Sequence, residues 1–201
     1  MSVDHLSDPA PALDIEADGR RRRGQDNRAR IVKAMLDLTR EGEITPVAER
    51  VAARADVGLR TVFRHFKDMD SLYSEMSEVI EVELAGVIYE PLKATFTKDR
   101  LIELIQRRAL VFERISPFKY ASEIHRHRSP FLEKGHARMV TGMRAALKSA
   151  FGVRLSENPV RFEAMDLILS YESWSRLRRD QGLTPEQACE VLICATEGLL
   201  A

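Results

Sequence analysis

Hydrophobic residues recur at intervals of three and four along most of the chain, the spacing that places them on one face of an α-helix. The first such run ends at Gly42 and consists of Ile31, Ala34, Met35 and Leu38. A longer stripe extends from Leu72 to Ile88 and stops near Pro91. Because the sequence contains neither an alternating strand pattern nor a hairpin turn signal, it predicts an all-α fold.

Four helix starts are marked by a polar capping residue followed by proline, in Thr45-Pro46, Ser129-Pro130, Asn158-Pro159 and Thr184-Pro185. The polar side chain accepts a hydrogen bond from an unpaired backbone N–H group, and a proline in the first helical position has no N–H group to satisfy. Thr184 and Gln187 also have the spacing of a capping box. We therefore expect a helix to begin at each of these prolines.

The pattern of the C-terminal half predicts further helices over residues 99–116, 120–127, 132–150 and 158–180. The first of them is expected to end at Ser116, because proline follows it. The helix over 158–180 and the last helix of the chain are apolar on more than one face, and such a helix must bury both faces. Packing against a second copy of the chain and burial within one chain are both open interpretations.

The segment from Thr45 to Tyr73 carries the sharpest local signal. It predicts a short helix over 46–55, a tight turn over 55–58 and a second short helix over 59–65. The inward positions of this pair are Val47, Val51, Ala52, Val62 and Phe66. The outward positions of the second helix are Leu59, Arg60, Thr61, Phe63, Arg64 and His65. This arrangement is typical of a helix-turn-helix that reads the DNA major groove, and an ordinary helical hairpin is the alternative.

The charge distribution adds to this interpretation. The chain has 31 basic and 31 acidic residues, but between Arg20 and Lys67 it has 13 lysines and arginines against six carboxylates, a local excess of seven positive charges. Such a block is typical of nucleic-acid binding, and a solvated helix surface is the other interpretation. Residues 1–25 are predicted to form a disordered arm. Its basic end, Arg20–Arg23, either contacts DNA or remains a solvated tail.

The motif residues resemble those of the TetR family of transcriptional regulators. The resemblance lies in Val51-Ala52-x-x-Ala55-x-Val57, then Thr61-x-Phe63-x-His65-Phe66, then Leu72. It implies an all-helical protomer, usually of nine helices, in which the first three bind DNA and the others form a ligand pocket and a dimer interface. The domains expected from it are an arm over 1–25, a helix-turn-helix DNA-binding domain over 26–72 and an effector-binding and dimerisation domain over 73–201.

The resemblance also implies roles for individual side chains. Residues placed at phosphates are Thr61, Phe63 and His65, and residues that approach base edges are Leu59, Arg60 and Arg64. The predicted DNA-binding set is completed by Thr45, Gly58 and Lys67. Three residues depart from the family pattern: Asp56 replaces a turn glycine, Phe63 a tyrosine that binds phosphate and Met69 a lysine.

The C-terminal part is expected to hold a small-molecule effector. Aromatic and methionine side chains from converging helices are candidate ligand contacts, and plain core packing is the alternative; the candidates are Phe112, Phe118, Tyr120, Met139, Met143, Tyr171 and Trp174. No cofactor or metal is expected. Glu123, His125, His127 and His136 are interpreted as surface polar residues, because a continuous helix points the first two histidines to different sides. Cys189 and Cys194 form neither a disulfide framework nor a metal motif.

The sequence thus predicts a cytoplasmic, ligand-responsive repressor with no membrane segment. Its expected partners are a palindromic double-stranded DNA operator, an unknown small molecule and a second copy bound through the last two helices. Two other classes remain: a helical interaction module that has lost DNA binding, and an enzyme. The enzyme class is disfavoured because the sequence has no nucleophile–base set, no Gly-rich phosphate loop and no metal cluster.

Overall fold

The computed structural model describes residues 15–127, 129–156 and 158–200, and these ranges are helical with no strand. This confirms the all-α prediction. The elements are α1 (Ile15–Arg40), α2 (Ala48–Arg54), α3 (Leu59–His65), α4 (Met69–Tyr89), α5 (Thr97–Arg126), α6 (Pro130–Ser156), α7 (Pro159–Ile168), α8 (Tyr171–Ser175), the π-helical turn η1 (Arg176–Asp180) and α9 (Pro185–Glu197).

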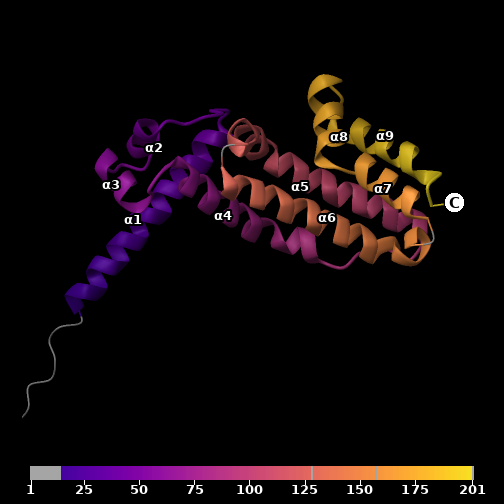
Figure 1. Ribbon diagram of the computed structural model, residues 1–201, viewed down its shortest axis with the longest axis horizontal. Coiled ribbons are helices and arrows are strands. Elements are labelled where there is room, and N and C mark those ends of the chain that lie inside the picture. The colour runs from indigo at the N-terminus through magenta and orange to yellow at the C-terminus, as the bar shows by residue number, and fades with distance from the viewer. Residues whose placement is uncertain (1–14, 128, 157, 201) are drawn as a thin grey trace, which may run out of the picture.

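The molecule is elongated, with α1, α2 and α3 at one end and the remaining helices in a bundle (Figure 1). The long helices α4, α5 and α6 pack against one another, and α9 packs on α5 and α7. Fully buried side chains fill the spaces between these helices, among them Leu101, Ile105, Leu147, Met165 and Trp174. The boundary expected between residues 72 and 73 falls inside α4, so one continuous helix joins the two parts.

Three of the four predicted proline starts are confirmed. Asn158 accepts from Val160 N and Arg161 N at 3.1 and 3.2 Å, and Thr184 forms its capping box with Gln187. At the start of α6, Ser129 Oγ accepts from Leu132 N at 3.4 Å.

The predicted start at Thr45-Pro46 is wrong. Helix α2 begins two residues later, with an extended Val47 in the capping position and no side-chain cap. Within α2, Ala48, Val51 and Ala52 are buried, the last two as predicted. Val47, also predicted to face inward, lies outside the helix in extended backbone, and its side chain is exposed.

Two predicted breaks are also misplaced. Pro117 lies inside α5, which runs without interruption through the two helices expected on either side of it. The proline forfeits one backbone hydrogen bond, but it lies between Ile115 and Phe118, and the helix keeps both of these side chains buried. The helix expected over 158–180 is instead divided where Ser170 accepts from Ser173 N at 3.2 Å and starts α8.

The arm predicted over 1–25 is helical from Ile15 onward, so the disordered assignment is wrong for residues 15–25; residues 1–14 lie outside the described ranges. Acidic residues at positions 16 and 18 precede the arginines at 20 and 22 by four residues, a spacing that favours helix. The N-terminal half of α1 projects beyond α2 and α3 (Figure 1). No helix in the described part of the chain is both long and apolar enough to span a membrane.

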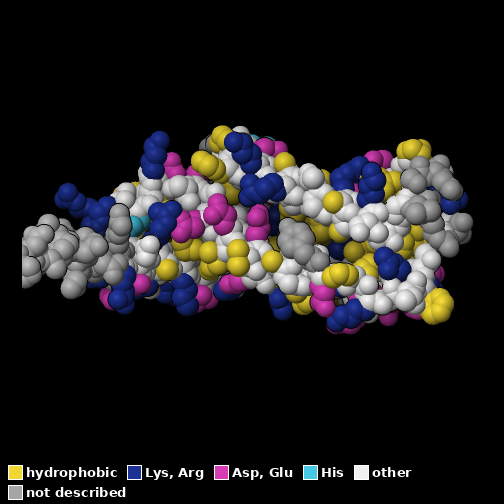
Figure 2. Space-filling view, turned by 90° about the horizontal axis from the view of Figure 1, so that it is seen from below, with side chains coloured by type: hydrophobic (Ala, Val, Ile, Leu, Met, Phe, Trp, Pro, Cys, Tyr) yellow, Lys and Arg dark blue, Asp and Glu magenta, His cyan; other side chains and the backbone are white. Residues whose placement is uncertain are grey.

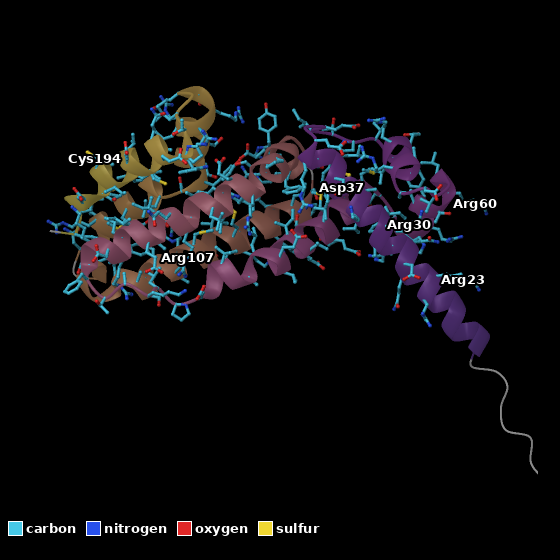
Figure 3. The ribbon with its side chains drawn as sticks, turned by 180° about the vertical axis from the view of Figure 1, so that it is seen from behind. Arg23, Arg30, Asp37, Arg60, Arg107 and Cys194 are labelled. Atoms are coloured by element: carbon cyan, nitrogen blue, oxygen red, sulfur yellow. The ribbon has the colours of Figure 1, made fainter. Side chains whose placement is uncertain are left out.

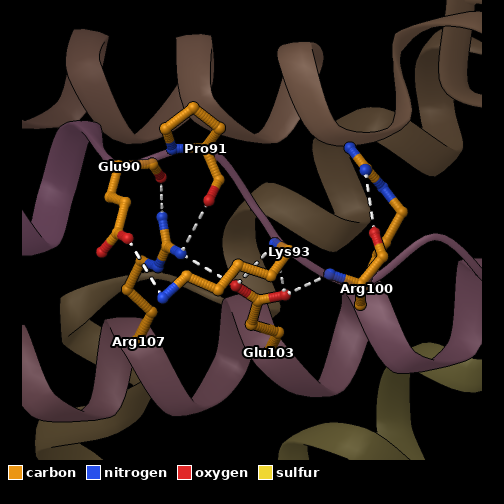
Figure 4. A network of polar contacts seen from close by, with 7 residues as sticks. Glu90, Pro91, Lys93, Arg100, Glu103 and Arg107 are labelled. Atoms are coloured by element: carbon orange, nitrogen blue, oxygen red, sulfur yellow. Dashed lines mark hydrogen bonds and ion pairs between the residues drawn. The ribbon is translucent and has the colours of Figure 1, made fainter.

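A carboxylate fixes the loop between α4 and α5 (Figure 4). Glu103 accepts from Lys93 N at 2.9 and 3.0 Å and from Ala94 N at 2.8 Å, and Arg107 Nη2 donates to it at 2.9 Å. Arg107 also donates to the carbonyls of Glu90 and Pro91. The backbone N–H groups of Ala94 and Lys93 hold the pKa of Glu103 below its usual value.

We expect Glu103→Gln to loosen this loop at neutral pH, because an amide cannot accept the same set of hydrogen bonds. Since the folded-state pKa of Glu103 is lowered, its carboxylate stabilises the fold above the unfolded pKa of about 4.3, and this contribution is lost as the pH falls through the folded value. Unfolding at pH 7 and pH 3, with hydrogen exchange at the amides of Lys93 and Ala94, measures the effect. Glu90→Gln is the matched control, and equal exchange in both variants contradicts the prediction.

Candidate nucleic-acid interface

The turn between α2 and α3 has the tight geometry of a helix-turn-helix. Asp56 adopts φ +51°, in the left-handed region that the family's glycine would occupy. Val57 N donates to Ala52 O at 3.0 Å, which closes the end of α2. Val62 and Phe66 are buried, as predicted, and direct the opposite face of α3 to solvent.

The outward face of α3 and the segment just after it carry basic side chains that no acid neutralises. Arg60, Arg64 and Lys67 are exposed, and among the described residues they form no ion pair or hydrogen bond. Figure 3 shows Arg60 pointing away from the body at the same end of the molecule as Arg23. Phe63 is 51% exposed and Leu59 is also exposed, so both present apolar surface beside the cations.

The other members of the predicted DNA-binding set lie around this face. Thr61 is half-buried on α3, and Gly58 is its exposed N-cap residue, with no side chain to accept from the helix. Thr45 is exposed in the bend before α2. These residues lie on or beside α2 and α3 at one end of the molecule, where Figure 2 shows several Lys and Arg side chains in dark blue.

Other basic residues of the N-terminal block are paired within the protein. Arg54 donates to both carboxylate oxygens of Glu41 at 2.6 and 2.7 Å. Arg50 donates to Glu43 at 3.2 Å. Arg30 donates to the side chain and the carbonyl of Asp56 at 3.1 Å, and Arg40 to Glu83 at 3.0 Å. The counted excess of positive charge therefore overstates the number of cations available to a phosphate backbone.

His65 is more enclosed than its predicted role at a phosphate requires. Its Nε2 atom is buried without a hydrogen-bond partner, and its ring lies against α1, where a Cβ on Gly24 would be 4.0 Å from Cε1. Burial lowers the pKa of His65, and the charges of Arg64 and Arg28 lower it further. The ring is therefore uncharged at neutral pH and provides packing between α3 and α1.

A cleft of about 390 Å³ opens between α5, α6, α7 and α8. Four of the predicted ligand contacts line it: Phe112, Met139, Met143 and Tyr171. The rings of Phe112 and Tyr171 meet edge to face with their centroids 5.6 Å apart. The sequence pattern thus identified aromatic and thioether side chains that the fold brings to one concave surface.

Three other predicted ligand contacts lie elsewhere. Trp174 is completely buried, and its Nε1 donates to Glu113 at 2.9 Å. Tyr120 lies on the surface under the guanidinium of Arg179, 4.3 Å from the ring centroid. Phe118 lines a different cleft. Helical spacing cannot distinguish these positions, because different helices pack against different faces of α5.

The pattern missed Arg108, which lines the same cleft. Its side chain is buried and donates to Leu169 O and Met143 O at 2.7 Å each, while its Nε has no partner. Burial lowers the pKa of Arg108 to about 10. The available signal was a charged residue four positions from Leu104 and from Phe112, on the apolar stripe of the helix.

Within the described part of the chain, no three His, Cys, Asp or Glu side chains gather as a metal site would require. His136 Nδ1 lies 2.9 Å from Lys119 Nζ. The side chain of His125 lies outside the described residues.

No protein-family model matches the chain, and no curated protein matches its sequence. Among solved structures, it is similar to a transcriptional regulator from Rhodococcus sp. Rha1, with a TM-score of 0.70 and 16% identity over 86% of this chain and 95% of that one. It is also similar to a protein described as a TetR-family transcriptional regulator from Mesorhizobium loti, with a TM-score of 0.66 and 17% identity over 89% and 96% of the two chains.

A further similar structure is that of the multidrug binding protein EbrR complexed with ethidium, with a TM-score of 0.58 and 22% identity over 84% of this chain and 98% of that one. The chain therefore has the fold of TetR-family transcriptional regulators, which confirms the fold that the resemblance implied.

The left-handed turn residue gives a test of the local geometry. We expect Asp56→Ala to lower the free energy of unfolding by about 1 kcal/mol, because a side chain without a local hydrogen bond resists this conformation. Asp56→Gly is expected to change it by less than about 0.5 kcal/mol, since the lost contact with Arg30 is an exposed pair. Urea unfolding measures both variants. An equal loss of unfolding free energy in the two variants would show that the ion pair with Arg30, rather than the backbone conformation, accounts for the stabilising effect of Asp56.

Proposed function

We propose that the chain is a TetR-family transcriptional regulator that binds double-stranded DNA through α3. The observation that carries this proposal is the set of unpaired cations formed by Arg60 and Arg64 on the exposed face of α3 and by Lys67 just after it, while buried Val62 and Phe66 fix the other side of the helix. Arginines in this position recognise guanine O6 and N7, and a lysine supplies a phosphate contact. In this proposal residues 26–72 bind DNA, residues 73–201 bind the effector and the second protomer, and α4 joins the two parts.

A homodimer is the proposed binding form. Helices α7 and α9 expose apolar side chains that one protomer leaves uncovered: Val160 and Leu167 on α7 and Val191 on α9. Cys194, exposed one turn beyond Val191, lies on the same helix (Figure 3). A two-fold axis through this surface would present two copies of α3 to half-sites of a palindromic operator about 34 Å apart.

The effector site of this proposal is the cleft lined by Phe112, Met139, Met143 and Tyr171. Its volume of about 390 Å³ is within the range of small-molecule sites, and its lining combines aromatic and thioether groups with a buried guanidinium. The similar structure of EbrR is a complex with ethidium. A ligand here contacts α5 through α8 and acts as a release signal for a repressor by favouring one of two arrangements of the dimer.

A helical interaction module without DNA binding is the second candidate. The observation that favours it is Phe63, which is exposed on α3 without the hydroxyl group that a tyrosine would offer to a phosphate. Salt-dependent binding to a specific site distinguishes the two functions.

Fluorescence anisotropy with DNA from the region upstream of its own gene tests the proposal. We expect specific binding that weakens steeply as the salt concentration rises, because bound cations release counterions from the DNA. Arg60→Ala/Arg64→Ala is expected to lose preference for the site by about 10-fold or more, since each bidentate base contact contributes about 1–3 kcal/mol.

Arg50→Ala/Arg54→Ala is the matched control. It removes the same charge from neighbouring α2, where both arginines are already paired with acids, and it should keep most of the site preference. Fragments selected from random DNA extend the test to an operator elsewhere. The proposal fails if the wild type prefers no sequence, or if the two double variants lose the same affinity.

The dimer surface is tested by sedimentation. We expect Val191→Glu to shift the protein from dimer to monomer at micromolar concentration, because the new carboxylate would be buried without a partner. Val82→Glu places the same charge on an exposed position of α4 and should leave the dimer intact. A dimer that persists in Val191→Glu but dissociates in Val82→Glu would move the interface to α4.

A further inference from the structure

A second, smaller cleft lies between α4, α5 and α6. Its volume is about 100 Å³, and none of its lining residues belongs to the cleft that contains Arg108. Its polar lining includes Lys119, Arg126, His136 and Arg138, and its apolar lining includes Ile115 and Phe118. The cleft is large enough for a small organic ion together with a few water molecules.

Lys119 is the most unusual charged group of this cleft. Its side chain is only 9% exposed, and its Nζ lies 2.9 Å from Nδ1 of His136, which accepts one of its three hydrogens. No carboxylate among the described residues lies within 4 Å of this ammonium group. The ammonium nitrogen also lies 5.4 Å from the centroid of the Tyr171 ring, and two of its N–H donors have no hydrogen-bond acceptor among the described residues.

Two of the three cations that line the cleft approach a carboxylate, and Lys119 does not. Arg126 approaches Glu133 at 3.6 Å, beyond hydrogen-bond distance, and its buried Nε has no partner. Arg138 is paired with Glu81 at 3.3 Å. The lining thus contains three cations and one carboxylate.

More distant acids act on Lys119 without contacting it. Burial lowers the pKa of Lys119, the charges of Glu172, Glu123 and Glu133 raise it, and Arg126 lowers it. The same groups face His136, whose pKa is lowered by burial, Lys119 and Arg126 and raised by Glu172 and Glu133. Leaving the buried ammonium group of Lys119 without a contacting anion costs free energy. A bound anion would recover that cost.

We propose that this cleft binds a small carboxylate, with Lys119 Nζ and Arg126 Nε as donors to its oxygens. His136 is a positioning residue, because it accepts from Lys119 and fixes the direction of the ammonium group. The apolar side chains of Ile115 and Phe118 accommodate a short hydrocarbon group on the carboxylate. A monoanion matches two donors and an apolar lining better than a phosphate dianion does.

The same cleft is connected to the DNA-binding end. Arg40 of α1 lies 5.6 Å above the ring of Phe118 and donates to Glu83 of α4. Ser74, which lines the cleft, is adjacent to Glu75, the partner of Arg28 in α1. An anion in the cleft therefore touches both helices that hold α1. The effect of a bound anion on DNA affinity rests on the proposed function, whereas the binding of the anion to the cleft does not.

Isothermal titration of the full chain without DNA tests the proposal. The probes are sodium butyrate, sodium acetate and inorganic phosphate at constant ionic strength. We expect saturable binding of butyrate, weaker binding of acetate because it covers less apolar lining, and the weakest binding for phosphate. Lys119→Met is expected to reduce butyrate affinity at least 10-fold, and Lys134→Met, at an exposed position of α6 outside the cleft, should not change it.

Circular dichroism establishes whether Lys119→Met is folded, and Arg126→Gln provides a second variant with the same expected loss. Absence of saturable binding of both carboxylates to the wild type overturns the proposal. Equal butyrate affinity in the wild type and both variants also overturns it, and tighter binding of phosphate than of butyrate overturns the choice of a carboxylate. A parallel anisotropy titration with DNA reports separately on the regulator function, so either result can fail without the other.

Discussion

The direction in which α3 faces depends on Arg28 of α1. Its guanidinium donates to the carbonyl of His65 at 2.7 Å, pairs with Glu75 of α4 and lies 4.5 Å over the ring of Phe66. The last carbonyls of a helix lack hydrogen-bond partners within the helix and form the negative end of its dipole. A cation at this end donates to a free carbonyl and interacts favourably with the dipole. One side chain thus joins α1, α3 and α4, and the exposed face of α3 takes its orientation from that junction.

This junction also explains why few of the N-terminal cations are available for a ligand. Arg28 is committed to holding the helices together, and Arg50 and Arg54 are paired with acids next to α2. Exposed pairs of this kind contribute little to stability, but they reduce the positive potential around themselves. Arg60 and Arg64 on α3 and Lys67 just after it are exposed, and they are not among the residues paired in this way.

Helix α5 supplies two buried cations to the bundle, and their surroundings give them different properties. Arg108 donates one hydrogen bond from each terminal nitrogen, to a carbonyl of α6 and to one at the end of α7, and so ties three helices together. Lys119 meets an imidazole and retains donors that face a cleft. The two sites lie on either side of Pro117, where the helix continues because the neighbouring apolar side chains are buried.

Local chemistry determined the features that the sequence predicted correctly. Asn158 and Thr184 cap their helices through hydrogen bonds that span two or three residues, and Asp56 marks the left-handed turn. Val62 and Phe66 face inward because four residues make about one helical turn. Contacts of this range join residues that are close in the sequence, so the helix-turn-helix and the all-α fold could be predicted from the sequence alone.

Tertiary structure alone decided which charges are neutralised and which apolar residues form a cleft. Arg28 and Glu75 are 47 residues apart, and Arg108 is 61 residues from the carbonyl of Leu169. Neither pairing has a local pattern. Likewise Trp174 and Tyr171 belong to one short helix, yet the first is core and the second lines the cleft. The burial of a side chain depends on how several helices pack around it, and a single stretch of sequence does not specify that packing.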